Sequence, residues 1–284
     1  MTRTCTLLFC LLAFSACSQV KQQYESPGGY DFNDPVVFKM PDDLKEISGI
    51  AFYPGDKRTL YAIQDEEGRL FYWPNGSPDS LRHLSFGKHG DYEDIGITRQ
   101  YAVILRSDGT LFSIPVQEIR SGSIHTVNEA PGLVPAGEYE GLYADAATDD
   151  LYILCKNCKA DRKTGRLSGY ILHLDEQGIP ALKGSFSIDT EHILKKASKQ
   201  GLRPSALALH PQTGEWYLLS SVNKMLIIAD RAWKPRKVIT LNPSLFPQPE
   251  GISFDIDNNL YISNEAGNTP EGTVLKFRYQ EAVR

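Results

Sequence analysis

Several residue types are scarce in this chain of 284 residues, and each shortage excludes a class of protein. It has 5 cysteines and 6 histidines, and its formal net charge is −5 without a basic stripe. That charge argues against a nucleic-acid partner. Beyond the N-terminus, no apolar run approaches the ~20 residues that a membrane-spanning helix needs. A G-x-S-x-G nucleophile elbow and a phosphate-binding GxxxxGK[ST] loop are also absent.

The first twenty residues, MTRTCTLLFCLLAFSACSQV, predict export from the cell. An early positive charge precedes an apolar stretch from Leu7 to Phe14, which is typical of a signal peptide over residues 1–16. The run FSAC resembles a bacterial lipobox, although Phe14 replaces the usual leucine, so Cys17 is the expected lipidation site; the alternative is plain secretion with a free thiol. Residues 17–33 then form a polar tether. We expect a protein held in the cell envelope, attached to a membrane only through its lipid.

The remaining cysteines offer little metal or redox chemistry. Cys5 and Cys10 leave with the signal peptide, which leaves only Cys155 and Cys158 in the domain, as C-K-N-C. A structural zinc ion needs four ligands, and no second cysteine pair exists. A thioredoxin-type site needs a βαβ setting that this sequence lacks. Two alternatives stay open for this pair, a local disulfide or two ordinary thiols.

The body of the chain repeats one pattern five times. Each unit is a short apolar strand, a polar turn and two further strands. The units run over Ile47–Trp73, Tyr92–Ile114, Tyr139–Asn157, Pro204–Asp230 and Pro249–Tyr279, and they start at Ser48, Glu93, Glu140, Ser205 and Glu250. The spacings between starts are 45, 47, 65 and 45 residues. Antiparallel units of that length indicate an all-β propeller with one blade per unit.

Five blades fit the available length better than the alternative of six, which would need some 45 more residues. The longest spacing holds an insertion, and residues 189–201 within it predict a short surface helix. The last unit supplies only three strands. We therefore expect the stretch PVVFKM, residues 35–40, to add the outer strand of the last blade and close the ring. The propeller would span residues 34–284, and a monomer is expected.

Glutamates start three of the five units. The first strand of a propeller blade lines the central channel, so Glu93, Glu140 and Glu250 are predicted to converge at one mouth. The second strand returns to the same face, where the corresponding residues are Asp65, Arg106, Lys156, Ser221 and Glu265. Two carboxylates ~6 Å apart at an effective dielectric of ~20 repel by about 3 kcal/mol, so something must offset several such pairs.

A bound cation or a rim of salt bridges would each provide that compensation. Oxygen ligands from several directions suit a hard cation such as Ca²⁺, with Glu93, Glu140 and Glu250 as first ligands and Asp65 and Glu265 as second choices. No histidine occupies either of these two sets of aligned positions, which disfavours zinc or iron. The other possibility is that each glutamate pairs with a basic residue or with water.

The combination LKEISGI, DYEDIGI, EYEGLYAD and LFPQPEGISFDIDNNLYISNE resembles the SdiA-regulated family of exported bacterial proteins over about Val36 to Tyr279. The resemblance implies an NHL-repeat-like propeller of five blades with a calcium site, whose positions match Glu93, Glu140 and Glu250 here. Serines at positions 48 and 205 interrupt the ring of glutamates, so other oxygens would complete the coordination. The family implies no particular reaction.

Two functions stay open at this point. The first is an envelope-anchored, calcium-binding propeller that binds a protein or a small ligand. The second is a calcium-dependent hydrolase of a lactone or phosphoester, with Asp94 or Asp65 as base and with Arg106 and Lys156 holding an anionic substrate. The absence of an aligned histidine disfavours the second function, because such hydrolases need a general base near the ion. Whether the protein is an enzyme is left undecided.

Overall fold

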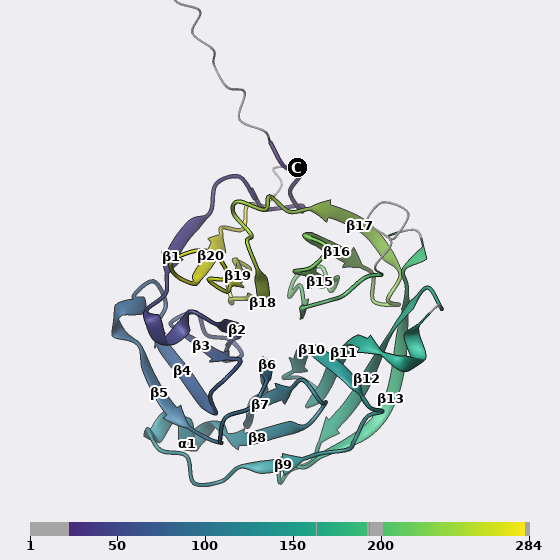
Figure 1. The fold of residues 1–284 in the computed structure, drawn as a ribbon. Coiled ribbons are helices and arrows are strands. Elements are labelled where there is room, and N and C mark those ends of the chain that lie inside the picture. The colour runs from purple at the N-terminus through teal and green to yellow at the C-terminus, as the bar shows by residue number, and fades with distance from the viewer. Residues whose placement is uncertain (1–22, 163, 192, 194–200, 282–284) are drawn as a thin grey trace, which may run out of the picture.

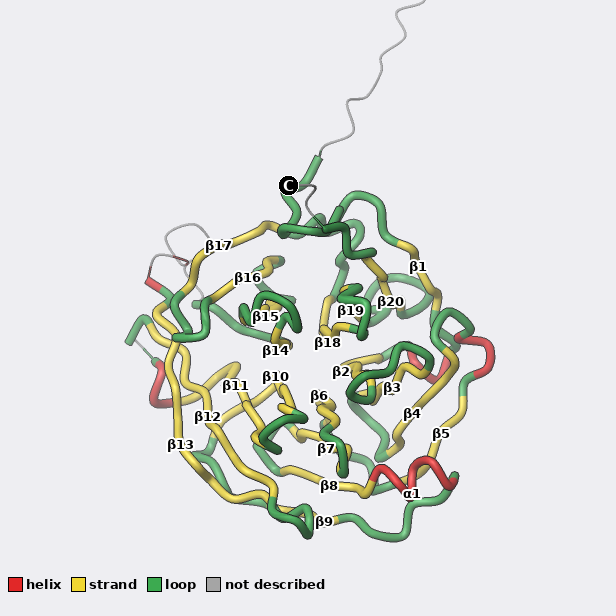
Figure 2. Tube along the Cα trace, turned by 180° about the vertical axis from the view of Figure 1, so that it is seen from behind, coloured by secondary structure: helices red, strands yellow, loops and turns green. Residues whose placement is uncertain are grey.

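The computed structural model describes residues 23–162, 164–191, 193 and 201–281, and it contains five four-stranded antiparallel sheets. The sheets stand around a central axis as the blades of a propeller, with the first strand of each blade innermost (Figure 1). The view from the opposite face shows the same ring, with the short helix α1 on its outside (Figure 2). The predicted five-bladed architecture is therefore confirmed.

The strands follow the predicted units closely. The blades are, in order: β2 (Ile47–Phe52), β3 (Thr59–Gln64), β4 (Arg69–Pro74) and β5 (Arg82–Ser85); β6 (Tyr92–Ile97), β7 (Tyr101–Arg106), β8 (Leu111–Pro115) and β9 (Asn128–Ala130); β10 (Gly137–Asp145), β11 (Asp150–Cys158), β12 (Arg166–Leu174) and β13 (Pro180–Asp189); β14 (Ala206–Leu209), β15 (Trp216–Ser220), β16 (Met225–Ala229) and β17 (Pro235–Thr240); β18 (Pro249–Phe254), β19 (Leu260–Asn264), β20 (Thr273–Phe277) and β1 (Val36–Lys39). Helix α1 covers Val116–Ser121, and single 3-10 turns cover Asp42–Leu44, Pro78–Ser80 and Lys159–Asp161.

The ring closes as predicted, because β1 supplies the outer strand of the last blade. It runs antiparallel to β20, with Val36 opposite Lys276 and Lys39 opposite Thr273. This pairing covers an edge that would otherwise expose unpaired backbone groups. Upstream, Tyr30 and Phe32 are only 7% and 2% exposed and pack with the core of the fourth and fifth blades. The packed chain therefore begins before residue 34, inside the segment expected to act as a tether.

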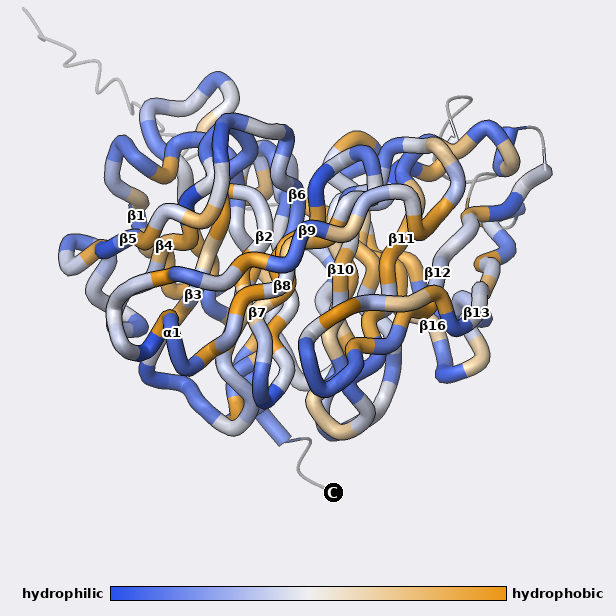
Figure 3. The backbone as a smooth tube through the Cα atoms, turned by 90° about the horizontal axis from the view of Figure 1, so that it is seen from below, coloured by the Kyte–Doolittle hydropathy of each residue, from blue (hydrophilic) through white to orange (hydrophobic). Residues whose placement is uncertain are grey.

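The core lies between neighbouring blades. Alternate side chains of each strand face the next sheet, and the hydrophobic residues gather at mid-height of the ring, while the loops at both faces are mostly hydrophilic (Figure 3). Between the first and second blades, Phe86, Tyr92 and Phe112 pack with ring centroids 5.0 to 6.0 Å apart. Each fully buried ring of this kind stabilises the fold by about 2–3 kcal/mol.

Three predicted features lie wholly or mostly outside the described residues. These are the signal peptide, the lipidation site Cys17 and most of the helix expected over 189–201. Within the described residues, no helix is long and apolar enough to cross a membrane.

Candidate functional site

Each of the three predicted glutamates is the extra residue of a β-bulge in the innermost strand of its blade. In β6 the pairing with β7 passes from Tyr92 to Asp94 and leaves Glu93 without a partner. Strands β10 and β18 skip Glu140 and Glu250 in the same way. A bulge breaks the alternation of a strand and changes the direction of the bulged side chain. This local irregularity explains how a charged residue is accommodated in an otherwise apolar strand.

The two serines of the same column connect blades instead of adding charge. The backbone oxygen of Ser48 accepts a hydrogen bond of 2.6 Å from the Ser263 hydroxyl of the fifth blade. The hydroxyl of Ser205 donates to the backbone oxygen of Pro249, at 2.8 Å. The positions that interrupt the glutamate ring therefore tie the fifth blade to its two neighbours.

Four of the five predicted metal ligands form one electrostatic group. Burial and the neighbouring carboxylates Glu250, Asp65 and Glu93 raise the pKa of Glu265 to about 8. Burial raises the pKa of Glu250 to about 7 and, together with acidic neighbours, that of Asp65 to about 6. The pKa of Glu93 is raised as well, by burial first and then by Asp91, with Glu250 and Asp65 contributing. Residues from the first, second and fifth blades thus share one acidic mouth.

The tightest part of this mouth is a group of three carboxylates from two blades. One oxygen each from Glu46, Asp65 and Glu265 lies within 4.8 Å of the others. Oxygens that share one Ca²⁺ at 2.3–2.6 Å can be at most about 5 Å apart, so this spacing suits a common cation. Moreover, Asp65 Oδ1 is buried and has no hydrogen-bond partner among the described residues. A buried carboxylate oxygen without a partner is costly, and a cation would satisfy it.

Sequence reasoning missed Glu46, although the repeat contained a signal for it. Two residues before the start of each unit the sequence reads Glu46, Asp91, Glu138, Arg203 and Gln248, so four of the five are acids or amides. Because these residues lie just before or at the start of the innermost strands, they lie at the same end of the ring as the first set of aligned residues. Gln248 donates from its amide to Glu265, and Asp91 raises the pKa of Glu93.

Two lysines offset part of the negative charge. Lys156 of β11 forms an ion pair with Glu140, which is 5% exposed, so this glutamate has the basic partner expected of a salt-bridged rim. Lys156 also lowers the pKa of Glu93 and Glu250 against the effect of burial. Lys224 also lowers the pKa of Glu250, and burial lowers the pKa of Lys224 itself. These two lysines thus face seven carboxylates, namely Glu46, Asp65, Asp91, Glu93, Glu140, Glu250 and Glu265.

The other two residues expected to contact a ligand lie apart from this group. The Arg106 guanidinium pairs with Asp108 at 2.9 Å and Glu129 at 3.5 Å. Asp94 is buried, and its carboxylate accepts hydrogen bonds from the backbone N–H groups of Ile95, at 2.8 Å, and Leu142, at 2.7 Å. Arg106 is therefore engaged toward the outer strands, and Asp94 ties the second blade to the third.

The C-K-N-C run forms a disulfide between Cys155 and Cys158, whose Cα atoms are 6.0 Å apart. Both half-cystines are buried, and Lys156 lies inside the loop that they close. The disulfide therefore fixes the strand segment that presents Lys156 to the acidic mouth.

Two solved structures share this fold at low sequence identity. A luciferin-regenerating enzyme has a TM-score of 0.54 and 12% identity, with 87% of this chain and 96% of that chain covered. The Myxococcus xanthus glutaminyl cyclase has a TM-score of 0.53 and 14% identity, with 87% and 98% covered. No curated protein sequence matches the chain. At this level of identity, these likenesses establish the fold alone.

The family comparison covers most of the repeat. The model of the SdiA-regulated family matches residues 36–269, a stretch that runs from β1 to the loop after β19 and includes every residue of the acidic mouth. On this match and the five-bladed fold, the chain belongs to the SdiA-regulated family.

Proposed function

We propose that the acidic mouth binds one Ca²⁺ ion through Glu46, Asp65 and Glu265, with Glu250 and Glu93 beside them. The observation that carries this proposal is the buried, unpartnered Oδ1 of Asp65 within a group of carboxylate oxygens no more than 4.8 Å apart. An oxygen-only ligand set favours a hard cation over zinc. The ion would neutralise carboxylates whose raised pKa values reflect burial and mutual repulsion.

The ion would connect the first and last blades of the ring. Glu46 and Asp65 flank the first hairpin of blade one, whereas Glu265 follows β19 in blade five. The backbone already joins these segments, since the N–H of Ala266 donates to the Lys45 carbonyl at 2.8 Å. A propeller gains most from a cross-link at this junction, because the two blades are far apart in sequence.

The sequence supports a wider role at the cell envelope. The expected signal peptide and the lipidation of Cys17 would tether the propeller to a membrane, where one face of the ring would bind a protein or small ligand. Attachment is tested by growing cells with labelled palmitate. The wild-type chain should incorporate the label and the Cys17→Ser variant should not. Equal labelling of both chains would reject lipid attachment at Cys17.

Calcium titration of the purified chain by calorimetry, after dialysis against EDTA, tests the metal site. We expect one site whose affinity falls at least about tenfold in Asp65→Asn, because the substitution removes a charged ligand. Glu176→Gln is the matched control, since Glu176 is exposed and forms no ion pair within the described chain. Absence of binding at about 1 mM calcium, or equal affinity in Asp65→Asn and wild type, would reject the site.

A calcium-dependent hydrolase remains the second candidate. It is supported by the position of Lys156 and Asp65 at the mouth, where a bound ion would polarise a substrate oxygen. Asp94 is less suited to act as the base, because both its oxygens accept backbone hydrogen bonds. A screen of lactones and phosphoesters should give turnover that EDTA abolishes. Turnover that survives EDTA would exclude the ion from the reaction.

A further inference from the structure

A second depression lies at the other end of the channel, where the innermost strands of all five blades end. It encloses about 320 Å³, at the lower end of the ~300–1,000 Å³ typical of small-molecule sites. Three successive rows of side chains line it. The first row is Ile50, Ile95, Leu142, Leu207 and Ile252; the second is Ala51, Gly96, Tyr143, Ala208 and Ser253; the third is Phe52, Ile97, Ala144, Leu209 and Phe254. We call this depression the apolar funnel.

The repeat itself builds the funnel. Its rows lie two, three and four residues after the unit starts that form the acidic mouth, so every blade contributes one residue to each row. The first row is only 2–4% exposed and forms an aliphatic floor. The second row is mostly small, and this leaves open space above the floor. The innermost strands pair on one side only, so their other edges offer backbone hydrogen-bonding groups toward the axis.

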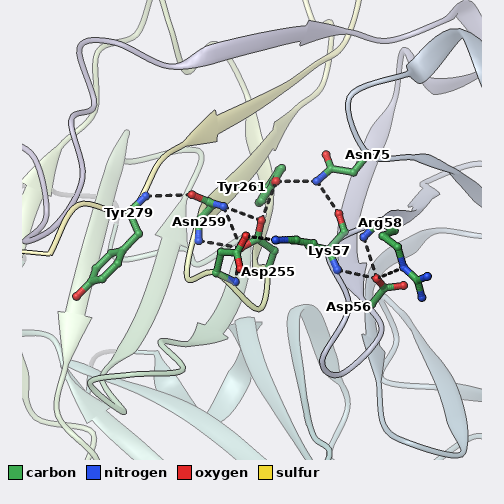
Figure 4. A network of polar contacts seen from close by, with 9 residues as sticks. Asp56, Lys57, Arg58, Asn75, Asp255, Asn259, Tyr261 and Tyr279 are labelled. Atoms are coloured by element: carbon green, nitrogen blue, oxygen red, sulfur yellow. Dashed lines mark hydrogen bonds and ion pairs between the residues drawn. The ribbon is translucent and has the colours of Figure 1, made fainter.

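Acidic side chains at the rim of the funnel are already engaged. Asp56 accepts hydrogen bonds from the backbone N–H and the Nε of Arg58, each 2.9 Å long (Figure 4). Asp255 is buried and accepts from Asn259, at 2.8 Å, and from the Tyr261 hydroxyl, at 3.0 Å (Figure 4).

Two further acids lie near the same rim. Asp257 pairs with Lys57 at 2.6 Å, and Asp145 accepts from the backbone N–H of Ala147 at 2.8 Å. Asp56 and Asp257 are thus paired with cations, whereas Asp255 and Asp145 accept hydrogen bonds from neutral groups.

Two arginines at the rim are different, because neither has an acidic partner within the described chain. Arg99 donates from Nε to the carbonyl of Ala146, which lines the funnel, at 3.2 Å. Arg120 lies with its Cζ 4.1 Å from the ring centroid of Tyr53, another lining residue, whose hydroxyl donates to the Arg99 carbonyl. Both arginines line a separate hollow of about 420 Å³ on the second blade, which shares no lining residue with the funnel. Each arginine thus contacts a residue that lines the funnel and adds positive charge beside its rim.

We propose that the apolar funnel binds a small amphipathic anion, with its apolar body on the aliphatic floor and its carboxylate at Arg99 and Arg120. The volume corresponds to about ten water molecules of ~30 Å³ each, which fits a medium-chain or aromatic monocarboxylic acid. Guanidinium groups bind carboxylates through paired, charge-assisted hydrogen bonds. This site is independent of the calcium site, since the two lie at opposite ends of the innermost strands.

Calorimetry with sodium octanoate tests the proposal on the full chain carrying Cys17→Ser, which prevents attachment of a lipid. We expect saturable 1:1 binding with a Kd on the order of 1 mM or tighter. Octylammonium, which has the same chain and the opposite charge, should bind at least about tenfold more weakly. Equal affinity for the two probes, or no saturation at about ten times that concentration, would overturn the proposal.

Variants then locate the ligand. The double substitution Arg99→Gln with Arg120→Gln should weaken octanoate at least about tenfold and leave octan-1-ol unchanged. Arg58→Gln, which alters a rim arginine already paired with Asp56, should have no such effect. Ser253→Phe fills the funnel and should abolish binding of both probes.

If Ser253→Phe does not fold, Ile256→Asp replaces it, because Ile256 is 56% exposed at the rim and tolerates a polar side chain. The negative charge of the new side chain should weaken the binding of octanoate and leave the binding of octan-1-ol unchanged. Unchanged octanoate affinity in the arginine double variant, or in the folded filling or rim variant, would place the ligand elsewhere.

Discussion

Replacing Glu265 with glutamine should stabilise the calcium-free protein and reduce the further stabilisation that calcium provides. Burial and acidic neighbours raise the pKa of Glu265 to about 8, whereas an unfolded glutamate titrates near 4.5. At pH 7.5 the folded state therefore keeps a proton that the unfolded state releases. The three-unit difference between pH 7.5 and the unfolded pKa corresponds to a loss of about 4 kcal/mol in the free energy of unfolding. Partial solvation of the folded carboxyl reduces this loss to about 2 kcal/mol. Glutamine is neutral in both states and removes that cost.

In EDTA, Glu265→Gln should therefore raise the melting temperature by roughly 4–8 °C for a domain of this size. Calcium should add less stability to the variant than to the wild type. At a concentration of 1,000 times Kd the ion stabilises the wild type by about 4 kcal/mol, and loss of one charged ligand removes at least about 1.4 kcal/mol of this. The calcium-induced shift in melting temperature should thus be smaller in the variant than in the wild type.

Differential scanning calorimetry at pH 7.5, in EDTA and in calcium, measures both effects, with Glu176→Gln as the control that should change neither. Two results would refute the reasoning. The first is a lower melting temperature of Glu265→Gln in EDTA, which would mean that the carboxyl stabilises the apo protein. The second is an equal calcium shift in the variant and the wild type, which would mean that Glu265 does not contact the ion.

Three further predictions concern pH, the contact between the second and third blades, and ring closure. Because the folded pKa values of Glu250 and Glu265 lie above 4.5, the apo protein binds more protons than its unfolded state between about pH 5 and 8, so its stability should fall as pH rises through that window. Urea unfolding in EDTA measures this slope, and saturating calcium should flatten it. A rise in stability with pH would contradict the prediction. Asp94→Ala leaves the buried N–H groups of Ile95 and Leu142 without an acceptor and should cost about 2–4 kcal/mol in urea unfolding, whereas a loss below 1 kcal/mol would show that water replaces the carboxylate. Deleting residues 1–40 removes β1 and the buried Tyr30 and Phe32, a loss of at least about 5 kcal/mol that should leave the chain largely unfolded by circular dichroism; a cooperative melt close to that of the wild type would contradict the role of β1 in closure.

The blade count and the closing strand could be predicted because they depend on local patterns. Short apolar strands with polar turns recur at a nearly constant spacing, and a last unit of three strands requires a fourth from elsewhere. Glu93 and Glu250 were placed at a common mouth by the same alignment. The bulges that accommodate these glutamates were not foreseen, because a bulge depends on how two strands pair and not on the residue at the bulge.

The candidate site itself was only partly predictable. Glu46 was missed because it precedes the aligned strand and reaches the site only through the contact between the first and fifth blades. Arg106 and Asp94 belonged to the right columns, yet competing partners within reach, Asp108 for one and the backbone of Leu142 for the other, hold them apart from the acidic group. An alignment of repeats gives the height of a residue along the axis but not the partners that compete for its side chain.

A five-bladed ring with acidic residues at one end of its innermost strands follows from period, strand length and turn residues, which are local properties of the chain. Which carboxylates share a cluster depends instead on the folded ring, because it is set by distances between blades more than a hundred residues apart in sequence. The folded ring also forms the apolar funnel at the opposite end and brings Arg99 and Arg120, which have no acidic partner among the described residues, beside it. Packing around a common axis sets both, and no local pattern records those distances.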